Sequence, residues 1–215
     1  MPQIFPPNTL VEETTLIATD ISLEEYMDKY SEYHSEWING SVYKKPSIDI
    51  KHHDLVGYFR LLFSAYFHFS PIGIALSSAF IMKLDSIPSC REPDVQIIIG
   101  ANQQNLTQVA MVGASDICIE VVSRGSITVD YDEKFTEYEK GGVKEYWILD
   151  PKRRTIDFHR LNADGVYEAQ QVHVDNTYKT PLVPNFVLHI PTLWREELPA
   201  TLETADIVRA MFKED

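Results

Sequence analysis

Two short runs of apolar residues constrain the fold of this chain more than any other feature. Residues 97–99 are three isoleucines, and residues 116–123 read Asp-Ile-Cys-Ile-Glu-Val-Val-Ser. Apolar side chains without polar alternation predict strands that are covered on both faces. The sequence therefore predicts an α/β domain, in which a mixed central sheet with strands at 93–99 and 116–123 is flanked by helices.

Two helices are expected to cover this sheet. The first begins at Asp49 and ends before Pro71 and Gly73, since neither residue type continues a helix well. The second spans 130–140 and ends at Gly141-Gly142, the residue type that favours a helix C-terminus. The first helix has an apolar face at steps of three and four residues, formed by Leu55, Phe59, Leu62, Phe63 and Tyr66.

Turn and capping signals predict smaller elements at both ends of the chain. Ser22 followed by Glu25 is typical of a capped helix start. Asn39-Gly40 between apolar runs predicts a hairpin over 36–43, because both residue types tolerate a positive φ. The other expected elements are strands at 74–84 and 145–149, a loop at 100–108, a hairpin of 155–160 with 166–174, and a helix near 202–212. We expect an N-terminal arm (1–21), a single domain (22–195) and a C-terminal helical tail (196–215).

The charge balance restricts the partners of the chain. Lys and Arg number 19 against 32 Asp and Glu, so the formal net charge is −13. Proteins that coat nucleic acid rely on surplus cations, so contact here requires a local basic patch or bound metal ions. The sequence shows no signal peptide, no membrane span and only two cysteines, Cys90 and Cys118. A cytoplasmic protein with no membrane partner is therefore expected.

Three charged residues interrupt the apolar framework and could carry chemistry. Asp94 begins one buried strand, and Glu120 lies inside the other, where a carboxylate is costly to bury without a partner. Lys134 lies on the following helix, with Asp130 and Tyr138 one turn away on the same face. Two carboxylates on neighbouring strands suit Mg²⁺ or Mn²⁺, and a lysine beside them can orient an attacking water.

The same residues also fit a structural interpretation. Pro-Asp before a strand is often a turn in which the Asp side chain accepts a hydrogen bond from nearby backbone. Glu120 and Lys134 could form a structural ion pair, although buried acids cluster at functional sites. The patterns alone leave both interpretations open. A transition-metal site at His52 and His53 is disfavoured, because adjacent helical residues point about 100° apart.

These residues, in this order, resemble the Uma-two family of restriction-endonuclease-like proteins in the PD-(D/E)XK nuclease superfamily. Pro93-Asp94-Val95 resembles the first acidic motif of the family, and residues 120–123 resemble its central strand. The resemblance extends over about residues 22–194. Its further matches are Glu36 before the first hairpin, His52 at the start of the long helix, Asp130, Lys134 and Tyr138 on the second helix, 142–151 after it, and 181–186.

The resemblance implies a restriction-endonuclease-like core with additional N-terminal and C-terminal β-hairpins. It implies that Asp94 and Glu120 bind Mg²⁺ or Mn²⁺ and that Lys134 positions the attacking water. The superfamily places its lysine two residues after the glutamate, but Val122 stands there in this chain. Lys134, with its long stem, is expected to supply the amine from the helix instead. Supporting roles are implied for Glu36 at the rim of the site, His52, Asp130 and Tyr138.

The leading hypothesis is a metal-dependent endonuclease that hydrolyses DNA. A homodimer is expected with it, since cutting both strands requires two sites related by a two-fold axis. A catalytically silent nuclease-like fold acting as a dimeric binding module is the alternative, and the net charge of −13 favours it. A hydrolase of small phosphoesters is a third hypothesis. The sequence specifies neither a target sequence nor a preference for DNA over RNA.

Overall fold

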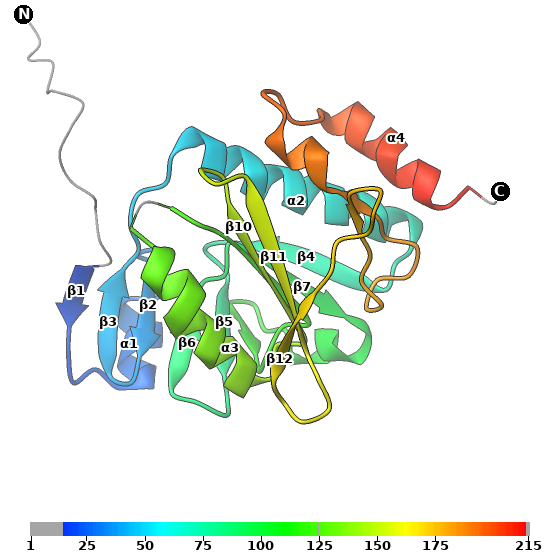
Figure 1. The fold of residues 1–215 in the computed structure, drawn as a ribbon. Coiled ribbons are helices and arrows are strands. Elements are labelled where there is room, and N and C mark those ends of the chain that lie inside the picture. The colour runs from blue at the N-terminus through cyan, green and yellow to red at the C-terminus, as the bar shows by residue number, and fades with distance from the viewer. Residues whose placement is uncertain (1–14, 124, 214–215) are drawn as a thin grey trace, which may run out of the picture.

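The structure is a computed structural model that describes residues 15–123 and 125–213, and its larger sheets are two of six strands each (Figure 1). The first sheet has the order β1 (Thr15–Ala18), β3 (Ser41–Lys44), β2 (Ser35–Ile38), β6 (Ser89–Arg91), β5 (Ile81–Leu84) and β8 (Ala110–Val112). The second, central sheet has the order β12 (Tyr167–Gln170), β11 (Thr155–Leu161), β10 (Glu145–Asp150), β9 (Ile117–Val121), β7 (Val95–Ile99) and β4 (Gly73–Ser77).

Helices surround these sheets, as the sequence predicts. They are α1 (Leu23–Lys29), α2 (Ile50–Phe69), α3 (Lys134–Gly141) and α4 (Thr201–Met211). Short 3₁₀ segments (Gly100–Asn105 and Ile190–Trp194), a π-helical turn (Val129–Glu133) and a small pair of strands, β13 (Thr177–Tyr178) with β14 (Leu188–His189), complete the described chain. None of the helices among the described residues is long and apolar enough to span a bilayer.

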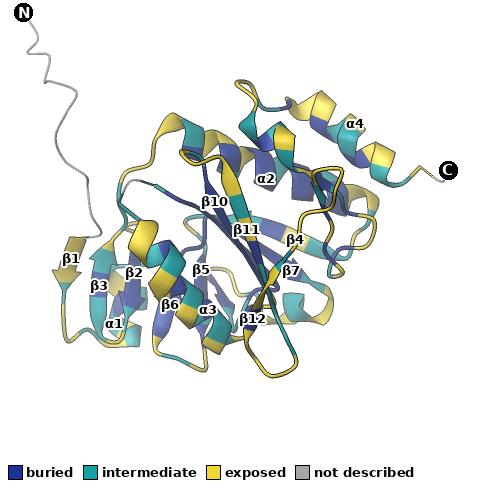
Figure 2. Ribbon diagram, in the orientation of Figure 1, coloured by how far each residue is buried: buried dark blue, intermediate teal, exposed yellow. Residues whose placement is uncertain are grey.

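The central sheet is mixed and covered on both faces, which confirms the predicted α/β class. Strands β9 and β10 run parallel, whereas β7 and β9 run antiparallel. Alternation sends Ile117 and Ile119 of β9 toward α2 and sends Cys118 toward Tyr138 of α3. Figure 2 shows the strands as a buried layer between exposed helix faces. Neither face of β9 is left to solvent, so a charged residue in it needs a partner inside the protein.

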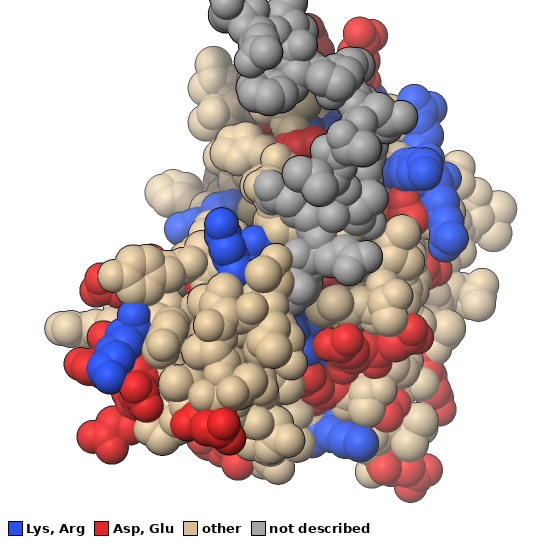
Figure 3. All heavy atoms as spheres, turned by 90° about the vertical axis from the view of Figure 1, so that its left-hand side faces the viewer, with Lys and Arg blue, Asp and Glu red and all other residues tan. Residues whose placement is uncertain are grey.

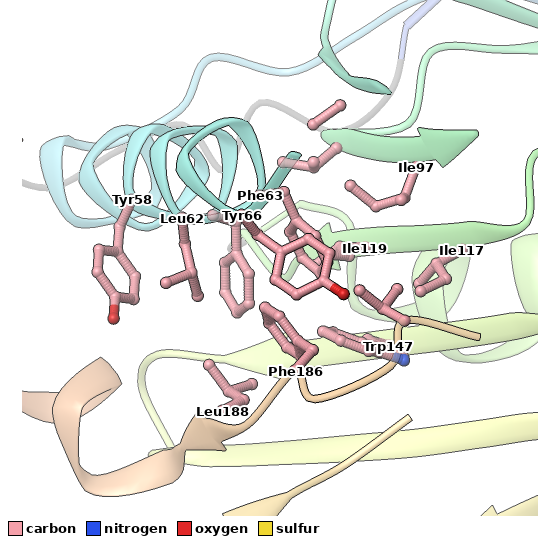
Figure 4. Close-up of a cluster of buried hydrophobic side chains, with 14 of the residues drawn as sticks. Tyr58, Leu62, Phe63, Tyr66, Ile97, Ile117, Ile119, Trp147, Phe186 and Leu188 are labelled. Atoms are coloured by element: carbon pink, nitrogen blue, oxygen red, sulfur yellow. The ribbon is translucent and has the colours of Figure 1, made fainter. Parts of the chain in front are cut away.

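The core on the α2 face is rich in aromatic residues. Phe63 of α2 stacks on Phe186, with ring centroids 4.6 Å apart and planes 10° apart. Trp147 of β10 lies beside both rings (Figure 4). This stacking places the C-terminal segment against α2. The helix α4 also packs on α2, and the ring centroid of Phe212, directly after α4, lies 5.1 Å from that of Tyr66. The predicted tail helix is thus packed on the domain.

Most local predictions are confirmed. Ser22 caps α1 by accepting a hydrogen bond from Glu25 N–H, and Asp49 caps α2 in the same way. Asn39 and Gly40 adopt φ of 47° and 85° between β2 and β3. Both predicted hairpins form and are built into the two large sheets. Of the predicted N-terminal arm, residues 1–14 lie outside the described residues, and 15–18 form β1 against β3. The predicted domain boundaries stay predictions.

The prediction of one strand over 74–84 is wrong. The segment forms β4 and β5, which belong to different sheets. A turn separates them, in which Phe80 N–H donates to Ser77 O. Other differences are smaller: the expected loop at 100–108 contains a 3₁₀ segment, β12 ends at Gln170, and β6 and β8 were not predicted. Three-residue strands such as β6 and β8 are too short to show a period.

We expect Phe186→Ala to lower the free energy of unfolding by about 3–5 kcal/mol, because it leaves a cavity against Phe63 and Trp147. Urea unfolding measures this. Leu202→Ala is the control, since Leu202 is 81% exposed, and its change should stay within about 0.5 kcal/mol. Equal effects of the two substitutions would show that the C-terminal segment does not belong to the core.

Candidate active site

The two predicted acids, Asp94 and Glu120, lie side by side in the central sheet. The antiparallel register pairs Val95 with Ile119, which brings Asp94 opposite Glu120. Asp94 N–H donates to Glu120 Oε2 at 3.4 Å, and Val121 N–H donates to Asp94 Oδ2 at 2.9 Å. Both side chains are buried. The structure thus brings together the two carboxylates that the sequence singled out.

Lys134 points at the same place from the first turn of α3. Its Nζ lies 2.9 Å from Glu120 Oε2 and 3.1 Å from Asp130 Oδ1. Tyr138, one turn further along the helix, donates its hydroxyl to Glu120 Oε1 at 2.8 Å. The π-helical turn at 129–133 leads directly into Lys134, and such turns are frequent at functional sites. Asp130, Lys134 and Tyr138 therefore surround Glu120 as one group.

Two further side chains, His52 and Lys45, hold Asp94. His52, near the start of α2, places Nε2 at 2.9 Å from Asp94 Oδ2. Lys45, directly after β3, places Nζ at 3.5 Å from Asp94 Oδ1 and donates to the backbone oxygen of Glu92 at 2.6 Å. His52 was predicted near the site, whereas Lys45 was not singled out. A basic residue after a surface hairpin carries no sequence signal that distinguishes it from a solvated one.

Glu36 is held away from the two acids by a buried arginine. Its Oε2 accepts from Arg91 Nη1 at 2.9 Å, and its Oε1 accepts from Glu92 N–H at 3.1 Å. Arg91 also binds Glu137 of α3 through Nε at 2.9 Å and Nη2 at 2.6 Å. Arg91, which the sequence reading did not single out, thus ties the first sheet to the helix that carries Lys134.

These side chains surround one small cavity of about 30 Å³. That volume holds a single water molecule or ion comfortably. Within residues 15–123 and 125–213, no group of three or more His, Cys, Asp or Glu side chains is arranged to hold a metal ion. The cavity is lined by Glu36, Lys45, Pro46, Ile48, His52, Asp94, Glu120, Val121, Ser123, Ser126, Val129, Asp130 and Lys134.

Comparison with known proteins identifies the relatives of the chain. The sequence profile of Uma2, described as "Putative restriction endonuclease", matches residues 23–191. The chain belongs to the Uma2 family. This match covers most of the chain, including every predicted site residue, and it confirms the resemblance seen in the sequence. No curated protein matches the sequence.

A solved structure shares the fold of this Uma2 chain. It is described as the "crystal structure of a putative nuclease belonging to DUF820 from Anabaena variabilis ATCC 29413". The TM-score is 0.67 at 19% sequence identity, and the match covers 81% of this chain and 97% of the other. The restriction-endonuclease-like α/β fold predicted from the resemblance is therefore confirmed.

The electrostatics of the site divide its acids into two kinds. Burial raises the pKa of Glu120 to about 7, with Asp94 and Asp130 adding to the effect and Lys134 opposing it. The pKa of Asp94 is lowered despite its burial, because Lys45 and the hydrogen-bonded His52 stabilise its charge. The pKa of Lys134 is raised although burial opposes this, because Asp130 and Glu120 flank it. Glu120 is therefore the acid poised to gain or lose a proton near neutral pH.

Glu36 differs from Glu120 although it is equally deep in the protein. Burial alone would raise its pKa, but Lys134, Arg91 and Lys45 together lower it to about 2. It stays charged at neutral pH. This anion offsets part of the positive charge beside Glu120, which is consistent with a positioning role at the edge of the site.

The raised pKa of Glu120 predicts a pH-dependent stability. A carboxyl with a folded-state pKa of about 7, against 4.5 as its ordinary value, contributes stability that is complete below the ordinary value and is lost as the pH rises through about 7. Between about pH 5 and pH 8, the stability of wild type relative to Glu120→Gln should fall by about 1–3 kcal/mol. Urea unfolding at both pH values measures this.

Glu32→Gln is the matched control, because Glu32 is exposed and the same charge is removed. Its stability difference from wild type should be independent of pH. A difference between wild type and Glu120→Gln that stays constant across the same range would contradict the assignment of Glu120 as the titrating acid.

Proposed function

We propose that this Uma2 protein is a divalent-cation-dependent endonuclease that hydrolyses phosphodiester bonds of DNA. The observation that carries the proposal is the convergence of Asp94, Glu120 and Lys134 on one small cavity. The membership of a family described as restriction endonucleases supports it. The fold shared with a protein described as a nuclease is consistent with it.

The residues at the cavity fit Mg²⁺ or Mn²⁺. Asp94 and Glu120 offer hard oxygen ligands, and Mg²⁺ typically takes one or two carboxylates and keeps several waters. Burial raises the pKa of Glu120 to about 7, with Asp94 and Asp130 adding to the effect, and a divalent cation beside this carboxyl would stabilise its ionised form. We propose Asp94 and Glu120 as the ligands. A bound divalent cation lowers the pKa of a water and stabilises charge on a phosphate.

The chain's own residues have separate tasks in this proposal. Lys134, held by Glu120 and Asp130, presents a permanent positive charge that orients the attacking water and neutralises the phosphate. Tyr138 fixes the orientation of Glu120. His52 and Lys45 fix Asp94, so that both carboxylates are already oriented before DNA arrives.

The proposal includes two expectations from the sequence. A homodimer would present two cavities, one for each strand of a duplex. A cytoplasmic location would give access to DNA. The alternative, a catalytically silent binding module, would keep the buried ion pairs and lack cation binding.

Plasmid cleavage with Mg²⁺ or Mn²⁺ tests the proposal. We expect Asp94→Asn, Glu120→Gln and Lys134→Ala each to lower the cleavage rate by about 100-fold or more, since the first two remove a proposed ligand of the cation and the third removes the positive charge that orients the water. Asp164→Asn is the control, because Asp164 lies in the exposed turn of the β11–β12 hairpin, and its rate should equal that of wild type. Equal rates in all four variants would overturn the assigned roles.

Calorimetric titration with Mn²⁺ tests the ligands without relying on activity. We expect binding by wild type, with release of a proton near neutral pH because Glu120 must ionise to bind the cation. The proton release makes the measured binding enthalpy depend on the protonation enthalpy of the buffer. Asp94→Asn should bind at least about tenfold more weakly, and Asp164→Asn should bind normally. No binding by wild type at millimolar Mn²⁺ would favour the silent module.

A further inference from the structure

One exposed turn concentrates positive charge on this acidic protein. The β10–β11 turn carries Lys152, Arg153 and Arg154 in succession, in a chain of net charge −13. All three residues are exposed. On the face shown in Figure 3, Lys and Arg atoms form a few separate groups among many Asp and Glu atoms. The three consecutive cations therefore give this turn a positive charge although the net charge of the molecule is negative.

The cations of this turn are available to a ligand. Within residues 15–123 and 125–213, neither the Lys152 ammonium nor the Arg154 guanidinium has a hydrogen bond or an ion pair. Arg153 Nε lies 3.5 Å from Asp150 Oδ2, and the Arg153 side chain is 66% exposed. Many other exposed cations are already neutralised: Lys29 pairs with Glu25, Arg195 with Glu203 and Arg209 with Asp206.

The side chain of Asp150 holds the backbone of the turn. Asp150 Oδ1 accepts hydrogen bonds from Lys152 N–H and Arg153 N–H, both at 2.9 Å. Arg154 adopts a φ of 54°, which reverses the chain into β11. The backbone that carries the three side chains is therefore already ordered, so little backbone entropy is lost when they bind.

The parallel pairing of β9 and β10 places this turn at the same edge of the central sheet as the cavity. Val122 N–H donates to Leu149 O at 2.7 Å, so the carboxyl ends of the two strands lie together. Glu120 lies near the end of β9, and the turn begins where β10 ends. In Figure 1 the β10–β11 turn lies in the upper half of the view, in front of α2. Parallel strands thus bring the proposed catalytic acid and the cations to the same edge of the sheet.

One hydrogen bond joins β11, the strand that follows the basic turn, to the π-helical turn that lines the cavity. Tyr131, next to Asp130 in the π-helical turn, donates its hydroxyl to Asp157 Oδ2 at 3.3 Å, and Asp157 lies in β11 shortly after the basic turn. Burial raises the pKa of Tyr131 to about 12, and Arg153 acts in the opposite direction. Arg153 is therefore within electrostatic reach of the segment that carries Asp130.

We propose that Lys152, Arg153 and Arg154 bind the DNA phosphate backbone beside the bond that is cleaved. This inference rests on the proposed function and adds the surface that holds the substrate. Guanidinium and ammonium groups are the usual partners of DNA phosphates. The turn also explains how a protein of this net charge can approach DNA: the attraction is local, and bound cations complete it at the cavity.

The test compares two variants of equal net charge. The turn variant carries Lys152→Gln, Arg153→Gln and Arg154→Gln. The control variant carries Lys140→Gln, Lys179→Gln and Lys213→Gln, three exposed residues on other parts of the surface. Binding of a short fluorescent DNA duplex is measured by anisotropy in EDTA, which prevents cleavage, over a range of salt concentrations. Circular dichroism and thermal unfolding check that both variants are folded, and Lys152→Gln alone leaves the Arg153–Asp150 pair intact.

We expect the turn variant to bind about tenfold or more weakly and to lose about two to three units from the slope of log K against log salt concentration. Lys152→Gln should lose about one unit, and the control variant should lose markedly less than the turn variant. In cleavage assays the turn variant should show a raised KM with kcat preserved, because it removes binding rather than chemistry.

The outcomes separate this inference from the proposed function. If wild type binds and cleaves DNA and the turn variant binds as tightly as wild type, the proposed DNA-binding role of the turn is overturned and the proposed endonuclease activity stands. If wild type binds through the turn but does not cleave with Mg²⁺ or Mn²⁺, the cleavage fails and the surface stands. Equal weakening in the turn and control variants, or no binding by wild type, overturns the surface.

Discussion

The buried contact between the Lys134 ammonium and the Glu120 carboxylate is the interaction on which the rest of the site depends. Each group alone would be costly in the interior of the sheet. Two neighbours add to the pair: the Tyr138 hydroxyl donates to Glu120 Oε1 at 2.8 Å, and Asp130 Oδ1 lies 3.1 Å from Lys134 Nζ. Burial raises the pKa of Glu120 to about 7, with Asp94 and Asp130 adding to the effect, whereas Lys45 and His52 keep Asp94 charged. Two adjacent carboxylates with different protonation are a common device of active sites.

Both large sheets hold the residues of this contact in place. The central sheet fixes Asp94 and Glu120 through the register of β7 and β9. The first sheet fixes α3, because Arg91 of β6 binds both Glu36 of β2 and Glu137 of α3. The site therefore lies where the two sheets and two helices meet. A change in the packing of either sheet would reach the cavity through these charged contacts.

Sequence reasoning found the parts of this site that interrupt a pattern. Glu120 stands out because it breaks an apolar strand, and Lys134 because it shares a helix face with Asp130 and Tyr138. Lys45 and Arg91 break no pattern, and their roles arise only when distant strands meet. The wrong single strand at 74–84 has the same origin. The segment is apolar on both sides of Ser77-Ser78, and two serines are a weak turn signal, so only the tertiary structure shows that it passes from one sheet to the other.

The π-helical turn before Lys134 carries a consequence for how such sites diverge. A π-helical turn contains one residue more than an α-helical turn over the same span, and one residue rotates a helix by about 100°. Losing a single residue within 131–133 would rotate Lys134 away from Glu120 without altering any residue that lines the cavity. The spacing of this segment, as much as its composition, determines where the amine lies. Alignments of distant relatives should therefore match the additional residue of the π-helical turn as well as the charged residues around it.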